Sequence, residues 1–300
     1  MNAIPVPATP AGSPAATSSV TDDGSAARAL SPTARPMPGR LGVLAAQVKA
    51  EFLQLVRAPE YVIGVVGVPV ILYSMFGLPT AGERLPGGTD VALMLLASFG
   101  AYGIVSQAIF TFGVDAARER GQGWLRRVRA TPMPMWAYFG AKVVSALAFT
   151  VLIWLGQVLV GVFAAHLVIP WPTLLRLLGA LMVGTVAFCT FGFAIAYWFT
   201  PKAAAAVGNL IFLPLSFCSG FFQPLSQLPE LFRTIAPYLP TYHYGFLTWG
   251  QVAPESDITA FTGGSAGALG IHVAWVAGAC AVFTVLTVIG YRRDLDRSRS

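Results

Sequence analysis

The segment DAARERGQGWLRRVRATPMP, from Asp115 to Pro134, lies between two long apolar runs and decides the topology of this chain. Five of its residues are arginines, and they fall within twelve positions. Guanidinium groups are costly in hydrocarbon, so we expect the segment to lie in water, on the side of a membrane that collects positive charge. The apolar residues Trp124, Leu125 and Val128 stand among the arginines and suit one edge of a short helix. A purely solvated loop would not need them, so we interpret the segment as a docking surface.

The composition is that of a membrane protein. The chain has 300 residues, of which 55% are hydrophobic and 11% are charged, whereas about a quarter of the residues in soluble domains are charged. Six runs of 22 to 34 residues contain no charged residue, at 61–82, 91–114, 143–175, 177–201, 203–229 and 258–291. A spanning helix needs roughly 20 apolar residues. We therefore predict an all-α membrane protein with six transmembrane helices.

The distribution of positive charge predicts the orientation. With six spans and both termini on one side, sixteen of the nineteen Lys and Arg residues fall on that side. Only Arg84, Arg176 and Arg233 fall on the other, which predicts cytoplasmic termini in a bacterial inner membrane. The net charge of +6 is thus a topology signal, with membrane lipid headgroups as partners and no role for nucleic acid. Lys142, near the cytoplasmic end of a span, is expected to snorkel to the interface.

Two segments precede the first span. Residues 1–38 are rich in Pro, Ala, Ser and Thr, which predicts a disordered cytoplasmic tail. From Leu41 to Arg57, apolar residues recur at steps of three and four, which predicts an amphipathic helix in the membrane interface. Its polar residues, Glu51 among them, are expected to lie mostly off the apolar stripe. The membrane domain should cover residues 39–293, followed by a cytoplasmic tail at 294–300.

The prolines and the turn residues place the ends of the spans. We expect spans at about 61–78, 91–114, 132–168, 174–199, 204–220 and 268–291, with Thr131 and Pro132 starting the third. Pro69 should kink the first span, and Pro214 and the Ser219-Gly220 pair should break the fifth. The segment 223–250 is too polar and proline-rich to span a membrane and too apolar to be a free loop, so we expect short helices lying in or dipping into the outer interface. Residues 254–267 are expected to be a polar connector.

Several kinds of chemistry are missing from the sequence. The six spans contain no Asp or Glu, which ion-driven carriers usually place at mid-membrane. No GxxxxGK[ST] loop or nucleophile signature occurs, and the three cysteines show no CxxC spacing. His166, His243 and His272 lie far apart, so interfacial histidines are favoured over a metal site. We predict no enzyme activity, no cofactor and no metal in this chain, and energy supplied by another polypeptide.

Three segments carry a resemblance to a known family. They are KAEFLQLVRAPEY at 49–61, RERGQGWLRRVRATPMP at 118–134, and LPLSFCSGFFQPLSQLPELFRTIAPYLPTYH at 213–243. The chain resembles the permease subunit of ABC type-2 exporters, the class that includes antibiotic and multidrug export permeases. The third segment is the most specific, through its Ser-Gly-x-x-x-Pro, Leu-Pro and Pro-x-x-Pro pattern.

The resemblance implies two permease copies, as a homodimer or a heterodimer, above two separate ATPase subunits that hold ATP and Mg. It implies a coupling helix from Glu119 to Arg129 that sits in a groove of each ATPase, and outer re-entrant helices that close the exit. The coupling residues are Glu119, Gly121, Gly123, Trp124, Leu125, Arg126, Arg127 and Arg129. The interfacial-helix residues are Glu51, Phe52 and Arg57, and those of the re-entrant segment are Ser219, Gly220, Pro224, Leu228, Pro229, Pro237 and Pro240.

Other readings stay open at this point. The arginines could serve topology alone, because positive loops on the cytoplasmic side are general. The chain could also be an ATP-independent transporter or channel, or a membrane assembly or immunity factor. An amphipathic, drug-like or lipid-like substrate suits spans rich in Phe, Leu and Gly. The polar residues within the spans that are candidates for the pathway are Gln107, Gln157, Asn209 and Ser216, although each type more often bonds helix to helix.

Overall fold

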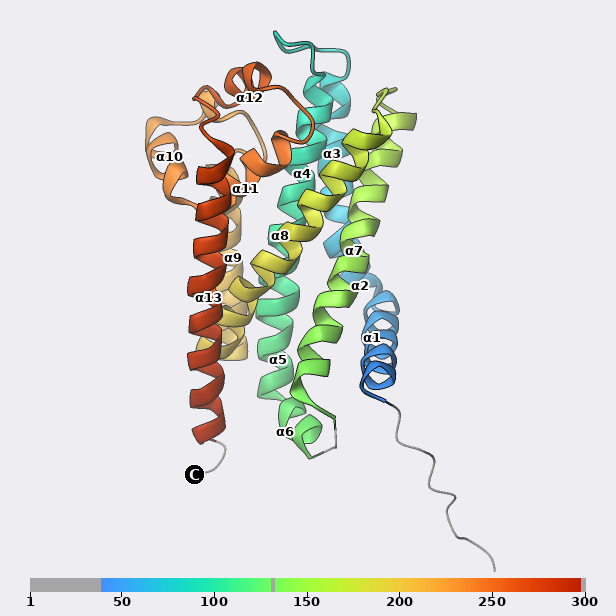
Figure 1. Ribbon diagram of the computed structural model, residues 1–300, viewed down its shortest axis with the longest axis vertical. Coiled ribbons are helices and arrows are strands. Elements are labelled where there is room, and N and C mark those ends of the chain that lie inside the picture. The colour runs from blue at the N-terminus through green and yellow to red at the C-terminus, as the bar shows by residue number, and fades with distance from the viewer. Residues whose placement is uncertain (1–38, 131–132, 298–300) are drawn as a thin grey trace, which may run out of the picture. The chain divides into compact units, whose positions relative to one another are not determined.

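The computed structural model describes residues 39–130 and 133–297, which form a bundle of helices (Figure 1). The expected disordered tail at 1–38 and the expected cap at Thr131 and Pro132 lie outside the described residues. Among the described residues, six helices are long and apolar enough to cross a membrane: Pro59–Thr80, Val91–Gly121, Met135–Phe163, Trp171–Trp198, Pro201–Cys218 and Leu269–Asp296. The prediction of six spans is confirmed, and the described residues form no strand.

The elements follow one another along the chain in this order. The first helix, α1 (Arg40–Val56), precedes span 1, which is made of α2 (Pro59–Val62), η2 (Ile63–Gly67), α3 (Val68–Phe76) and η3 (Leu78–Thr80). Span 2 is α4 (Val91–Gln107), η4 (Ala108–Asp115) and α5 (Ala116–Gly121), and α6 (Trp124–Arg129) follows it. Spans 3, 4 and 5 are α7 (Met135–Phe163), α8 (Trp171–Trp198) and α9 (Pro201–Cys218). After them come η5 (Leu225–Gln227), α10 (Glu230–Ile235), η6 (Ala236–Tyr238), α11 (Pro240–Trp249), α12 (Glu255–Thr262) and the last span, α13 (Leu269–Arg297).

Span 2 is the core of the bundle. In the most apolar stretch of this span, 89% of the residues are buried within the chain, whereas the figure for the last span is 11%. Small residues let the neighbouring helices approach it closely, as is common between membrane helices. At Gly192 of α8, a β-carbon would lie 2.0 Å from the carbonyl oxygen of Ala108, so the contact between α8 and η4 requires glycine. Span 2 therefore contacts the other helices more extensively than the last span does.

Several expected boundaries differ from those observed. Span 2 continues as a helix to Gly121 and α13 continues to Arg297, and Arg120 near the end of span 2 pairs with Asp294 of α13 at 3.2 Å. Pro214 lies inside α9 without breaking it, so the expected break there is wrong. The fifth span does end at Cys218, two residues before Gly220, which adopts the left-handed φ of 78°. The expected connector at 254–267 contains the helix α12.

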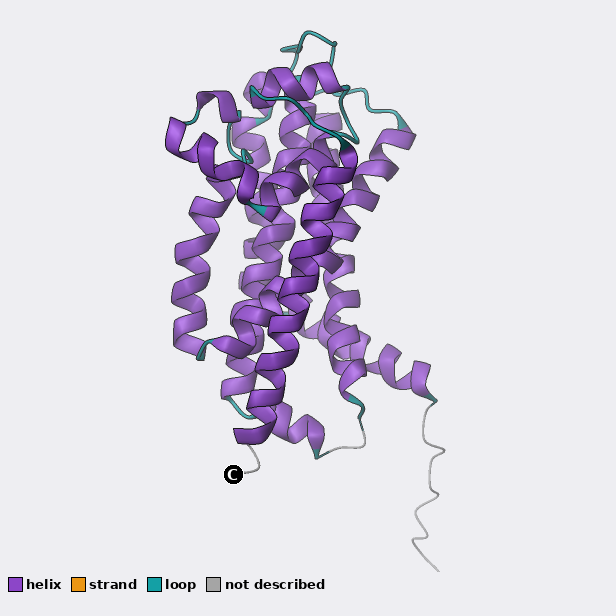
Figure 2. Ribbon diagram, turned by 60° about the vertical axis from the view of Figure 1, so that its left-hand side comes forward, coloured by secondary structure: helices purple, strands orange, loops and turns teal. Residues whose placement is uncertain are grey.

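Short helices and loops gather at one end of the bundle (Figure 2). This end carries α10, α11, α12 and the loop between spans 1 and 2, whereas α1, α6 and the C-terminal end of α13 lie at the opposite end (Figure 1). Asp257 of α12 fastens the loop, because its carboxylate accepts hydrogen bonds from the backbone N–H groups of Gly87 and Thr89. Burial opposes ionisation of Asp257, but these hydrogen bonds outweigh it and hold the pKa of the carboxyl below its usual range.

Candidate functional site

The basic segment folds as two pieces rather than as one short helix. The structure divides the expected helix of Glu119 to Arg129, because α5 ends at Gly121 and α6 begins at Trp124. Gly123 lies between them with a φ of 72°, which glycine adopts without strain. Glu119 therefore belongs to the end of span 2, and only α6 is a separate helix. Gly121 touches the start of span 5, since a β-carbon there would lie 2.5 Å from the Pro201 ring.

The helix α6 presents both an aromatic and a basic side chain to solvent. Trp124 is 40% exposed, and the exposed Arg127 places its guanidinium 5.8 Å from the centre of the indole ring. Arg127 also donates a hydrogen bond to the carbonyl of Gln122 at 3.0 Å. Val128 is buried, so the expected apolar edge is split between the inside and the outside. The side chains of Leu125, Arg126 and Arg129 lie outside the described residues.

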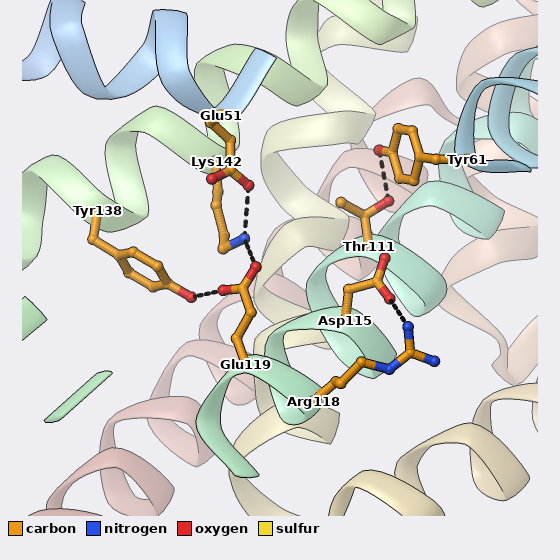
Figure 3. Close-up of polar contacts among 8 residues, drawn as sticks. All are labelled: Glu51, Tyr61, Thr111, Asp115, Arg118, Glu119, Tyr138 and Lys142. Atoms are coloured by element: carbon orange, nitrogen blue, oxygen red, sulfur yellow. Dashed lines mark hydrogen bonds and ion pairs between the residues drawn. The ribbon is translucent and has the colours of Figure 1, made fainter. Parts of the chain in front are cut away.

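A buried lysine joins this region to two other parts of the chain. The Lys142 ammonium of α7 lies 2.7 Å from a carboxylate oxygen of Glu51 on α1 and 2.8 Å from one of Glu119 on α5 (Figure 3). Tyr138, one turn before Lys142, donates its hydroxyl hydrogen to the other oxygen of Glu119. We call Glu51, Glu119, Tyr138 and Lys142 the lysine cluster. Buried charges are tolerated when they are paired and hydrogen-bonded, and this cluster meets both conditions.

The lysine cluster corrects two expectations. Lys142 was expected to snorkel to the interface, but it is 3% exposed and points into the bundle. Glu51 was expected off the apolar stripe of α1, but it is the residue of that helix that is buried. Its neighbour Phe52 packs on Phe149 of α7 with 5.6 Å between ring centres, and Arg57 is exposed at the end of α1. The sequence shows these charges, but not that three segments bring them together.

A cavity of about 390 Å³ opens beside the lysine cluster. It lies among α1, the start of span 1 and the end of span 2, and its charged lining residues are Glu51, Glu60, Asp115, Arg118, Glu119 and Lys142. Tyr61 and Thr111 share a hydrogen bond of 2.9 Å on its wall, and Arg118 pairs with Asp115 at 3.6 Å (Figure 3). Carboxylates outnumber basic side chains around this cavity, although the segment from Asp115 to Pro134, which lines part of it, is basic as a whole.

Arg120, in the basic segment, joins the ends of three spans. Arg120 contacts Asp294 of α13 at 3.2 Å and donates a hydrogen bond to the carbonyl of Phe199 after α8. It thus ties the end of span 2 to the ends of the fourth and last spans. This role was missed because Asp294 was assigned to a tail, whereas α13 continues through it.

The expected residues of the re-entrant segment lie around the turn after span 5. Ser219 and Thr241 share a buried hydroxyl–hydroxyl hydrogen bond of 2.5 Å, which joins the end of α9 to α11. Leu228 is buried in a small apolar cluster, and Gly220 makes the left-handed turn. Four prolines begin or flank the short elements here: Pro224 before η5, Pro229 before α10, Pro237 within η6, and Pro240 at the start of α11.

The candidate pathway residues have different surroundings. Gln107 and Gln157 are fully buried, and their amide groups donate to backbone carbonyls of other spans, at Ala146 (3.3 Å) and at Pro69 (3.5 Å). Both therefore join helix to helix, as do many polar residues in membranes. Ser216 is buried, whereas Asn209 lies exposed on span 5; each bonds to a carbonyl of its own helix.

Comparison with known proteins identifies the family. The model of the ABC-2 type transporter family matches residues 43–246, which include most of α1, the first five spans and most of α11. The chain belongs to the ABC-2 type transporter family. It is 25% identical over 217 residues to the putative transport permease YvfS of Bacillus subtilis, covering 71% of this chain and 86% of that protein. It is 26% identical over 171 residues to the probable multidrug ABC transporter permease YbhR of Escherichia coli, covering 52% of this chain and 46% of that protein.

Membership of the ABC-2 family agrees with the number of spans. Permeases of this family are membrane subunits of transporters, which agrees with six spans and with the resemblance found in three segments. The chain spans about half the length of the Escherichia coli relative that it matches. Within the described residues, no group of three or more His, Cys, Asp or Glu side chains is arranged to hold a metal ion.

Proposed function

We propose that this chain is the permease subunit of an ATP-driven exporter and that a separate ATPase subunit drives it through α6. The proposal is supported by family membership and by the position of α6, which stands at the end of the bundle with an exposed Trp124 and Arg127. An aromatic side chain flanked by arginine suits a groove lined with carboxylates. The end that carries α1, α6 and the C-terminal end of α13 would then be cytoplasmic, in the inner membrane of a bacterium.

The observation that carries the proposal is the lysine cluster behind α6. A displacement of α6 acts on α5 across Gly123. Because α5 is the last part of span 2, the displacement then reaches the core of the bundle. The same end of span 2 is fixed to α7 and α1 through Glu119, Lys142 and Glu51. Packed helices and buried ion pairs move as units rather than bending continuously. A push on α6 therefore shifts span 2, α7 and α1 together.

The burial of the spans favours a pathway between two copies of the chain. A route through one copy would have to separate helices from span 2, which is 89% buried. Spans 1 and 5 and the last span are 22%, 28% and 11% buried and present wide free faces. Asn209 is exposed on span 5, where a polar amide facing lipid would be unfavourable. We infer that this face meets a second permease copy and an amphipathic, drug-like or lipid-like substrate, in keeping with the word multidrug in the name of the Escherichia coli relative.

The experiment tests docking and transport separately. We expect the chain to co-purify with an ATPase that contains GxxxxGK[ST] and is encoded beside it. Arg127→Glu should lose that association or the stimulation of ATP hydrolysis, because it reverses the charge of an exposed side chain whose contacts within the chain, with Trp124 and Gln122, are local. Lys202→Glu is the matched control, since Lys202 is an exposed base at the start of span 5 and not part of α6.

The outcomes separate the alternatives. Loss of ATPase stimulation in Arg127→Glu, with normal membrane insertion and a normal Lys202→Glu control, supports the coupling role. Equal behaviour of the two variants would refute docking through α6. Transport by the purified chain without any ATPase would replace the proposal by an ATP-independent transporter, and the absence of both transport and an ATPase partner would favour an assembly or immunity factor.

A further inference from the structure

Two histidines that lie far apart in the sequence meet at the end of the bundle opposite to α6. His243 of α11 and His272 near the start of α13 are 5% and 6% exposed, and their Nδ1 atoms lie 2.9 Å apart. The sequence suggested separate interfacial histidines. The structure makes them a buried pair at the contact between the short outer helices and the last span.

The hydrogen bonds of the pair fix its number of protons. The Nε2 atom of His243 lies 2.9 Å from the carbonyl oxygen of Pro237, and that of His272 lies 2.6 Å from the carbonyl oxygen of Ala266. A carbonyl only accepts, so both Nε2 atoms must carry hydrogen. Two neutral rings would then direct two Nδ1 lone pairs at each other, and two imidazolium rings would direct two hydrogens. Attraction at 2.9 Å requires one Nδ1 hydrogen, and therefore a single positive charge on the pair.

The surroundings of the pair suit a positive charge. The ring of Phe246 stacks on His272 with 4.6 Å between centres and an interplanar angle of 5°. The indole ring of Trp275 stacks on His243 at 4.9 Å and 11°. Aromatic faces attract cations, and desolvation strengthens that attraction. The pair is thus held between two aromatic faces and two carbonyl oxygens, all of which favour one added proton.

The other titratable groups around the pair are few. From α11, Tyr242 packs edge-on against His243 at 5.2 Å, and burial raises the pKa of its hydroxyl, so it stays neutral. The segment η6 and the loop before α13 contact the two rings through backbone carbonyls, those of Pro237 and Ala266. Within the part of the chain that the structure describes, neither ring makes an ion pair or hydrogen bond with an Asp, Glu, Lys or Arg side chain. The N-terminal end of α13 carries the positive end of the helix dipole, which disfavours a cation at His272. The carbonyl and aromatic contacts of the pair must offset this effect.

We propose that His243 and His272 form a binding site for one proton and that this proton latches α11 to the last span. The latch is closed when the pair carries one charge, and it is weakened when the pair loses that proton or gains a second. In the orientation proposed above, this end faces the outside of the cell, so external pH sets the state of the latch. The inference concerns the permease chain alone and does not depend on an ATPase partner.

The pH dependence of the latch has a defined sign. Unfolded histidines titrate near pH 6.5. A pair that holds its shared proton above that pH, as proposed, binds more protons than the unfolded chain, so stability falls as the pH rises and that proton is lost. Burial lowers the pKa of His243, and the charge on His272 lowers it further, against the effect of the Pro237 carbonyl. A second proton is therefore resisted, and stability also falls as the pH drops below about 6.5.

Labelling can test the pair directly, because the chain contains three histidines. The full chain is labelled with ¹⁵N-histidine in lipid nanodiscs, and ring nitrogen signals are followed with pH. We expect two rings to share one strongly deshielded Nδ1 proton that is still present above the ordinary value near pH 6.5. His166→Asn is the matched control: His166 is exposed and has a φ of 53°, which asparagine tolerates, so the pair should be unchanged.

A substitution within the pair provides the second arm. An asparagine at position 243 can place an amide donor near the former Nδ1 and bond to a neutral His272, so His243→Asn needs no proton at the contact. The shared signal should disappear, and the unfolding midpoint should lose the fall above about pH 6.5 that His166→Asn keeps.

Three results would overturn the proposal. One is two neutral rings with unprotonated Nδ1 atoms at pH 7. A second is a pH profile of unfolding that His243→Asn leaves unchanged. A third is a shift of both Nδ1 signals with one equivalent of Zn²⁺ that a chelator reverses, which would make the pair a metal site instead.

Discussion

The sharpest test of the lysine cluster is to replace Lys142 by methionine. The Lys142 side chain is 2% exposed and those of its partners Glu51 and Glu119 are 8% and 21% exposed, so Lys142→Met leaves two carboxylates facing each other with little water. Removing one partner of a buried ion pair costs about 3–5 kcal/mol, because the remaining charge keeps its desolvation cost. Tyr138 still donates to Glu119, which limits the loss at that carboxylate. We expect about 4 kcal/mol, within that range for a broken buried pair.

The assay is thermal unfolding of the purified chain in detergent, followed by tryptophan fluorescence. At about 2 °C per kcal/mol for a chain of this size, the midpoint should fall by about 8 °C in Lys142→Met. Lys49→Met is the control, because Lys49 is exposed on α1 and loses the same charge without leaving a buried partner. Adding Glu51→Gln to Lys142→Met removes one orphaned charge and should restore part of the midpoint.

Two results would contradict this reasoning. A Lys142→Met midpoint within about 1 °C of the Lys49→Met control would mean that the ion pairs contribute no more than an exposed charge. A further fall on adding Glu51→Gln would mean that Glu51 stabilises the fold without Lys142. Either result would also remove the physical basis for a push on α6 reaching α1 and α7 as a unit.

Further predictions concern the core and the outer loop. Gly192→Ala should lower the free energy of unfolding by about 1–3 kcal/mol, because a β-carbon there overlaps the backbone of η4; Gly179→Ala on the same helix meets nothing within 4 Å and should be neutral in the same thermal assay. Asp257→Asn should release the loop between spans 1 and 2 and speed tryptic cleavage after the exposed Arg84, whereas the exposed Glu255→Gln should cleave like the wild type. Because the pKa of Asp257 is lowered, its contribution is present above the unfolded value of about 3.9 and is lost as the pH falls through the folded one, so acid should destabilise the wild type more than Asp257→Asn.

The boundaries show where local sequence rules hold and where packing overrides them. Gly123 and Gly220 mark real ends of helices, since each adopts a left-handed φ. Pro214 does not break span 5, because α9 continues through it. Pro69 is the second residue of α3, just after the π-helical turn η2, which accommodates the missing backbone donor within span 1. A proline in a membrane helix is thus a weaker stop signal than a glycine in the left-handed region.

The sequence by itself determined the number of spans, because a charge-free run either reaches the thickness of hydrocarbon or does not. It also placed the basic segment between spans 2 and 3. Only the tertiary structure decided which charged residues meet. Glu51 and Lys142 are 91 positions apart, and His243 and His272 are 29 apart. Contacts of this kind depend on how each helix is rotated about its axis and how closely its neighbours pack, and glycines such as Gly192 set that distance. The sequence predicts that the basic segment forms one helix. In the structure, Glu119 and Arg120 belong to the end of span 2 and contact other spans, and α6 is a separate helix.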